Sequence, residues 1–179
     1  KDIYRNGVKY AVDVLLMTAP ETDQANEVQH ALAKIVAIMN FAKLTDLFGD
    51  VPYSEGLKGS ENVTPAYDNQ VVIYQDLVSQ LNIAIDMFTN SVGANGLGSA
   101  DVMFGGDVAK WAKFANTLKL RLLIRMSGAS ETSSFASSEF ASMNTSVGFI
   151  TEDAMVNPGY IATSGKQNPY WDVYHTNAA

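Results

Sequence analysis

The sequence from Asp107 to Gly128 reads DVAKWAKFANTLKLRLLIRMSG, and this stretch says most about the fold. Its apolar residues recur at intervals of three and four, which places them on one face of a helix. These residues are Trp111, Phe114, Ala115, Leu118, Leu122 and Met126. Asp107 can cap the first turn because its carboxylate can accept from free backbone N–H groups, and Gly128 ends the helix. We expect a long amphipathic helix with Trp111 in the protein core.

Further helices are predicted on both sides of this stretch. Apolar residues recur with helical spacing over residues 2–18, 21–48 and 68–89, and more weakly over residues 131–143. Long helices that alternate with loops predict an all-α array of antiparallel helix pairs. A strict repeat of about 34 residues is not present, so a regular tetratricopeptide solenoid is not expected.

Particular residues set the expected helix ends. Pro20 follows the first helix, because a proline disfavours helix at the residue before it. Gly49 allows a sharp turn after the second helix, and Asp50 can accept from the backbone donors of that turn. Asp68 is the predicted N-cap of the third helix. Beyond Asn144 no helical period is visible.

The composition is that of a globular protein that does not bind nucleic acid. The chain has 179 residues, of which 47% are hydrophobic and 17% charged, and this length can bury one core. Its net charge of −7, without a stripe of Lys and Arg, disfavours contact with phosphate backbones. The sequence starts at Lys1 rather than Met. We interpret residues 1–179 as a single helical domain fragment of a longer protein, with any targeting segment outside it.

No group of residues points to a metal or a cofactor. The chain has no Cys, which excludes disulfides, thiol nucleophiles and Cys-bound metals. His30 and His175 lie far apart in the sequence, and neither has a set of ligands at metal-binding spacing. We interpret both histidines as structural or surface residues.

Two features resemble active-site motifs only superficially. Asp46 with Asp50, or Glu152 with Asp153, could form a general acid–base pair of the glycosidase type, but turns and helix caps need carboxylates at the same places. The loop GANGLG at residues 93–98 lacks the preceding strand that a dinucleotide site requires. We therefore expect no catalytic residues and interpret this loop as a connector.

An aromatic cluster near the C-terminal end is the strongest candidate for ligand contact. It consists of Tyr160, Tyr170, Trp171 and Tyr174, in a region without helical period. Aromatic faces stack on the C–H surfaces of sugars and hold ligands at small entropic cost. The same residues could instead pack against a C-terminal part of the protein that lies outside this sequence. We predict that Trp171, with Tyr170 and Tyr174, lines part of a ligand cavity.

Three stretches occur together in a recognisable order. They are LTDLFGDVPY at residues 44–53, YDNQ followed by IYQDL within residues 67–77, and GDVAKWAKFANTLKLRLLIR at residues 106–125. In order and spacing they resemble the SusD/RagB family of outer-membrane nutrient-binding lipoproteins from Bacteroidetes. The resemblance covers nearly the whole chain, and the third stretch is its most specific part.

The resemblance implies a fold, a location and a partner. Family members are helical, with degenerate tetratricopeptide-like helix pairs and long irregular loops, and a lipid on an N-terminal Cys anchors them in the bacterial outer membrane. They cover a SusC-like TonB-dependent β-barrel transporter, hold glycans or peptides before uptake, and have no catalytic activity or cofactor. In this chain the anchor would lie outside the sequence. The matched residues Asn116, Arg121 and Arg125 would then bridge helices.

The leading hypothesis is capture of a glycan or an oligopeptide at the cell surface and its delivery to the transporter. A helical scaffold that binds only proteins is the alternative. A helical glycosidase is a third, which would require a carboxylate pair that the sequence does not single out.

Overall fold

The computed structural model describes residues 3–23, 25–91, 97–157, 159–168 and 170–171. Its elements are the π-helix η1 (Ile3–Val8), the α-helices α1 (Lys9–Met17), α2 (Glu27–Phe48), α3 (Gln70–Asn90), α4 (Val108–Ser127) and α5 (Ser133–Ala141), and the short 3₁₀ helices η2 (Gly59–Glu61) and η3 (Gly98–Ala100). Within the described ranges, β pairing is limited to an isolated antiparallel bridge between Val51 and Asp68. The all-α prediction is therefore confirmed.

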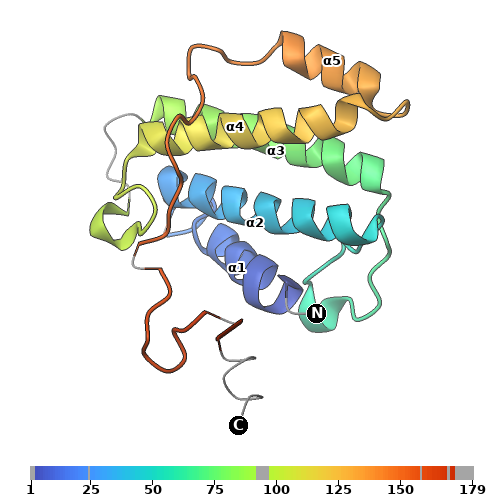
Figure 1. The fold of residues 1–179 in the computed structure, drawn as a ribbon. Coiled ribbons are helices and arrows are strands. Elements are labelled where there is room, and N and C mark those ends of the chain that lie inside the picture. The colour runs from blue at the N-terminus through green and yellow to red at the C-terminus, as the bar shows by residue number, and fades with distance from the viewer. Residues whose placement is uncertain (1–2, 24, 92–96, 158, 169, 172–179) are drawn as a thin grey trace.

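The helices form a stack in which each packs on its neighbours in the sequence. Figure 1 shows α1 at one end of the stack, followed by α2, then α3 and α4 side by side, and α5 at the other end. Consecutive α-helices run in opposite directions, so that neighbours in the stack are antiparallel. This arrangement agrees with the predicted antiparallel helix pairs.

The core lies between α2, α3 and α4. Its largest fully buried apolar side chains are Ile35, Leu44, Ile73, Leu77, Leu81, Phe88, Leu122 and Leu123. Trp111 is only 7% exposed, so its predicted place in the core is confirmed. Its ring meets Phe104 edge to face, with centroids 5.0 Å apart and planes at 85°, and Phe114 in the same way at 5.7 Å. Such pairs stabilise a core by about 0.5–1.5 kcal/mol beyond the burial of their area.

Two predicted helix starts differ from the structure. The second helix begins at Glu27 and not at Glu21, because the Asn26 side chain accepts from the Gln29 N–H and so caps the helix there. The third begins at Gln70, with Asn69 rather than Asp68 as its N-cap. Asp68 is extended and pairs with Val51, which directs its carboxylate away from the helix.

Asp68 and Asp50 hold the loop between α2 and α3. The carboxylate of Asp68 accepts from the N–H groups of Tyr53 and Ser54, both at 2.9 Å. Gly49 ends α2 with φ +73°, a value that favours glycine. The carboxylate of Asp50 then accepts from the Gln70 N–H at 2.8 Å, so it caps the start of α3. The predicted role of Gly49 in this turn is confirmed. Asp50 differs from its prediction, because its carboxylate accepts from the start of α3 and not from the backbone donors of the turn itself.

A buried carboxylate organises the loop before α4. Asp101 is 7% exposed, and its side chain accepts from the backbone N–H groups of Met103, Phe104 and Gly106 at 2.9–3.2 Å. It also accepts from the Trp111 indole N–H at 2.7 Å. The loop then leads into α4, where Asp107 accepts from the Lys110 N–H at 3.0 Å and is the predicted N-cap.

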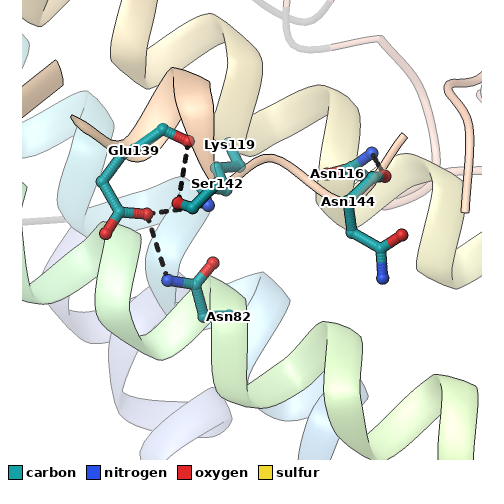
Figure 2. Close-up of polar contacts among 6 residues, drawn as sticks. All are labelled: Asn82, Asn116, Lys119, Glu139, Ser142 and Asn144. Carbon is teal, nitrogen blue, oxygen red and sulfur yellow. Dashed lines mark hydrogen bonds and ion pairs between the residues drawn. The ribbon is translucent and has the colours of Figure 1, made fainter. Parts of the chain in front are cut away.

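Polar side chains link α4 to the helices around it. Lys119 lies 2.8 Å from a carboxylate oxygen of Glu139 on α5, and the Asn82 amide on α3 donates to the same oxygen at 3.2 Å (Figure 2). Arg125 pairs with Asp46 on α2, and this pairing confirms its predicted bridging role. Asn116 instead donates to the segment that follows α5, because its amide faces that side of α4.

Within the part of the chain that the structure describes, none of the helices is both long and apolar enough to cross a membrane.

Candidate ligand-binding groove

The segment after α5 is held along α4. Its backbone accepts from the Asn116 amide, donates to the Thr117 hydroxyl, and pairs with the loop before α4. The hydrogen bonds are Asn116 Nδ2 to the carbonyls of Asn144 and Gly148, Ile150 N–H to Thr117 Oγ1, and Asn157 N–H to the Val102 carbonyl. An exposed ion pair between Lys110 and Glu152, at 2.6 Å, adds to these contacts. Residues 144–157 therefore form a strap across α4 (Figure 1).

Beyond the strap, the chain folds back on itself in a small loop. The Ile161 N–H donates to the Lys166 carbonyl at 3.0 Å, and the Gln167 amide donates to the Ala162 carbonyl at 3.2 Å. Asn168 then starts a turn, because its side chain accepts from the Tyr170 N–H and its carbonyl from the Trp171 N–H, both at 2.9 Å. These local bonds position the aromatic residues on either side of the loop.

A groove of about 320 Å³ opens in this loop. It is lined by Tyr160, Ile161, Ala162, Gln167, Asn168 and Trp171. Tyr160 and Trp171 are 68% and 55% exposed, which is unusual for large aromatic side chains. The loop brings Tyr160 and Trp171 to one groove, although they stand at opposite ends of the loop in the sequence.

The other members of the aromatic cluster have different positions. Tyr170 is 74% exposed and is not among the residues that line the groove. Tyr174 lies outside the described residues. Of the three predicted ligand contacts, the structure therefore places Trp171 at the groove and Tyr170 next to it.

The groove has the chemistry of a binding site. Its two aromatic rings offer flat apolar faces, and the side-chain amides of Gln167 and Asn168 offer donors and acceptors beside them. Its volume is at the lower end of the range for small-molecule sites in proteins. Its six lining residues include no Asp, Glu, His, Lys or Arg, so a ligand in the groove would be held by aromatic faces and neutral polar groups.

Neutral residues of this groove gave no signal in the sequence. Ile161, Gln167 and Asn168 have no periodicity and no charge, so sequence reasoning did not find them. Asn168 stands before Pro169 in the sequence, and an Asn-Pro pair favours a turn. That signal could have located the turn that orients Trp171, but not the groove itself.

The alternative chemical candidates have structural partners. The Thr18 hydroxyl lies 3.2 Å from His30 Nδ1, and burial, with the nearby Lys34 ammonium, lowers the pKa of His30. Asp46 binds Arg125 and the Tyr74 hydroxyl, which keeps it in a contact between helices. His175 and most of the glycine-rich loop lie outside the described residues. Among the residues that are described, no three His, Asp or Glu side chains gather as a metal site would require.

Comparison with known proteins agrees with this fold. A family model named SusD-like, described as starch-binding and associating with the outer membrane, matches residues 2–174. A search of curated proteins found no match.

Solved structures with this fold are similar over three quarters or more of the chain. A SusD homologue from Bacteroides uniformis has 29% identity and a TM-score of 0.75, and the match covers 96% of this chain and 34% of that one. An outer-membrane protein of Bacteroides vulgatus linked to nutrient binding has 26% identity and a TM-score of 0.74, and the match covers 94% of this chain and 36% of that one. A chitin-binding SusD homologue from Flavobacterium johnsoniae has 28% identity and a TM-score of 0.64, and the match covers 75% of this chain and 28% of that one. The chain spans about a third of the length of these structures.

Proposed function

This chain belongs to the SusD-like family of starch-binding proteins associated with the outer membrane, and we propose that the protein containing it captures glycans at the bacterial cell surface. Family membership assigns the protein to the outer membrane. Its proposed activity is binding without catalysis, in keeping with a family of binding proteins.

The groove at Trp171 carries the proposal at the level of residues. Exposed aromatic rings such as Trp171 and Tyr160 can stack on the apolar face of a sugar ring, and the neighbouring amides can bind its hydroxyl groups. We propose Trp171 as the main contact, with Tyr160 in the same groove and Tyr170 beside it. Tyr174, which lies outside the described residues, is proposed as a further contact from the sequence alone. Starch-type glycans and, by analogy with the relative from Flavobacterium johnsoniae, chitin-type glycans are the first candidates.

The proposed partner is a SusC-like TonB-dependent β-barrel transporter, to which the captured ligand is delivered. A binding protein at the outer membrane needs a route for its ligand to cross that membrane. A lipid anchor on a part of the protein outside this sequence would hold it beside the transporter, and an oligopeptide remains an alternative cargo.

A co-purification experiment tests the uptake role. The full-length protein is tagged, extracted gently from native membranes, and its partners are identified by mass spectrometry. We expect a large β-barrel transporter in equal amount. Recovery of no membrane partner, or of a soluble hydrolase only, would contradict the uptake proposal and favour a helical scaffold.

Isothermal titration with malto-oligosaccharides and chito-oligosaccharides tests the ligand class. The expected result is saturable binding of at least one of these two series by the full-length protein. Absence of binding to both series, together with binding of short peptides, would replace glycans by oligopeptides as the cargo.

A further inference from the structure

A second cavity, of about 310 Å³, lies between α3, α4 and the start of the strap. Its polar lining residues are Asn82, Asp86, Asn116, Lys119, Ser142 and Asn144, and Ile85 adds an apolar patch. Figure 2 shows these polar side chains except Asp86, with Lys119, Ser142 and Asn82 on one side and Asn116 and Asn144 on the other. This cavity is separate from the groove at Trp171, since the two have no lining residue in common.

The charged group in the wall is almost completely buried. The Lys119 side chain is 4% exposed, and its ammonium lies 2.8 Å from Glu139, whose side chain is 21% exposed. The same carboxylate oxygen accepts from Asn82, so the two residues that border the cavity share one anionic partner. The Lys119 ammonium has three N–H donors. Among the described residues, its anionic partner is Glu139. The remaining donor capacity of Lys119 is available at the cavity wall.

A buried acceptor in the same wall lacks a donor. Asn116 is 0% exposed, and its amide nitrogen donates to two backbone carbonyls, those of Asn144 and Gly148, both at 3.0 Å. These bonds fix the orientation of the amide, because the flipped form would oppose oxygen to oxygen. The Asn116 Oδ1 atom is then buried without a hydrogen-bond donor among the described residues. Buried acceptors in folded proteins almost always have a donor, so this one indicates a missing partner.

The charges around the cavity restrict the class of that partner. Glu139 neutralises Lys119, and Asp86 adds a negative charge at the rim, so an anion would meet a net repulsion. A metal ion would face the Lys119 ammonium and lacks a cluster of ligands in the part of the chain that is described. An apolar ligand would leave the Asn, Ser and Lys groups unpaired. A neutral molecule with several hydroxyl groups satisfies both the donors and the acceptors.

We propose that this cavity is a second ligand site, which binds one neutral, hydroxyl-rich ring of the size of a monosaccharide. One hydroxyl group would donate to Asn116 Oδ1. Others would bind Lys119, Asn82, Asp86 and Ser142, and the C–H face would lie on Ile85. The cavity volume of about 310 Å³ can accommodate a single sugar ring. The proposal does not depend on ligand binding at Trp171.

The test uses the full-length protein and the probes D-glucose, D-galactose and D-xylose, with binding followed by saturation-transfer NMR. Ser142→Leu fills the mouth of the cavity from an exposed position at the end of α5. Ser138→Leu is the matched control, because Ser138 is also exposed on α5 but does not line the cavity. Asp86→Ala removes a rim group without touching α5.

We expect at least one sugar to bind the unmodified protein, at least tenfold weaker binding to Ser142→Leu and to Asp86→Ala, and no change in Ser138→Leu. Trp171→Ala should retain this binding, which separates the site from the proposed glycan groove. The proposal is overturned if none of the sugars binds, or if both cavity variants bind like the unmodified protein. It is also overturned if a crystal structure of the full-length protein shows only water or another segment of the protein in the cavity.

Discussion

Trp171 is the residue on which the proposed glycan site depends. It is 55% exposed, so its removal leaves no hole in the helical core. Trp171→Ala should weaken glycan binding by about 1–3 kcal/mol, because a ring that stacks on the ligand is lost. The midpoint of thermal unfolding should stay nearly unchanged. Titration calorimetry and thermal unfolding of the same preparation measure the two quantities.

The control for this variant is Tyr67→Ala, since Tyr67 is 73% exposed and lies in the loop between α2 and α3. It should bind glycan like the unmodified protein. Unfolding of Trp171→Ala would instead place Trp171 in the core of the full-length protein and remove it from the ligand site.

Asp101 shows the effect of a single buried carboxylate. Asp101→Asn keeps the size of the side chain but exchanges one acceptor oxygen for an amide that opposes the N–H groups around it. We expect a loss of about 2 kcal/mol in the free energy of unfolding, since hydrogen bonds to charged groups contribute about 1.5–3 kcal/mol each and the variant keeps some of them. Urea unfolding at pH 7 measures this loss.

Asp23→Asn is the matched control for Asp101, because Asp23 is exposed. It should unfold like the unmodified protein. Equal stability of the Asp101 and Asp23 variants would show that the loop before α4 does not need the carboxylate.

At the scale of helices, the ion pair between Lys119 and Glu139 joins α4 to α5. Glu139→Gln leaves the Lys119 ammonium, whose side chain is 4% exposed, without an anionic partner. We expect a loss of about 2–4 kcal/mol in the free energy of unfolding, because an unpaired buried charge is costly. The double variant Lys119→Met/Glu139→Leu should recover most of it, since no charge then remains in the interface.

The comparison for this interface is Glu152→Gln, which breaks the exposed pair with Lys110 and should have little effect on unfolding. Chemical denaturation of the three variants gives the free energies. A double variant as unstable as Glu139→Gln would mean that packing, and not the buried charge, determines the loss.

The sequence predicts helices well where local chemistry and periodicity agree. In α4 the apolar stripe and the cap at Asp107 indicate the same start, and the structure has it there. The second helix was predicted too early because apolar spacing continues through Ala25, whereas the cap at Asn26 determines the start. The sequence predicts Asp68 as the N-cap because aspartate is common at that position. In the structure Asp68 is instead paired with Val51, which is distant in the sequence. Such contacts have no local signal.

The candidate site was only partly predictable for the same reason. Three of the aromatic residues lie close together in the sequence, so their density was visible, and Trp171 does line the groove. Tyr170 follows the same pattern but does not line it, because the turn at Asn168 determines which ring faces inward. The buried network around Asn116 and Lys119 depends on three helices at once and left no pattern in the sequence.

At the scale of the whole molecule, acid should weaken the fold. Burial alone raises the pKa of Asp101 and of Glu139, but hydrogen bonds from Trp111 and from Lys119, with those of nearby donors, outweigh it, so both pKa values lie below their usual 3.8 and 4.5. These carboxylates stabilise the fold fully at a pH above their usual pKa values, which apply to the unfolded chain. This stabilisation is lost as the pH falls through their lower pKa values in the folded protein. Urea unfolding at pH 7, 5, 4 and 3 should show a steady decline below about pH 4.5.

The double variant Asp101→Asn/Glu139→Gln tests the origin of this decline. It should be less stable at pH 7 but should change less between pH 5 and pH 3. An equally steep decline would assign the acid sensitivity to other carboxylates.

The neighbour-by-neighbour order of the helix stack also affects how the molecule comes apart. Each helix packs mainly on the one before it and the one after it, as in repeat proteins, whose stability is close to a sum of local interfaces. Contacts between segments close in sequence also favour rapid folding. A substitution that weakens the contact of α5 with α4 can therefore unfold α5 locally while α2 and α3 remain packed together. The cooperativity of unfolding then depends on the strength of each interface between neighbouring helices.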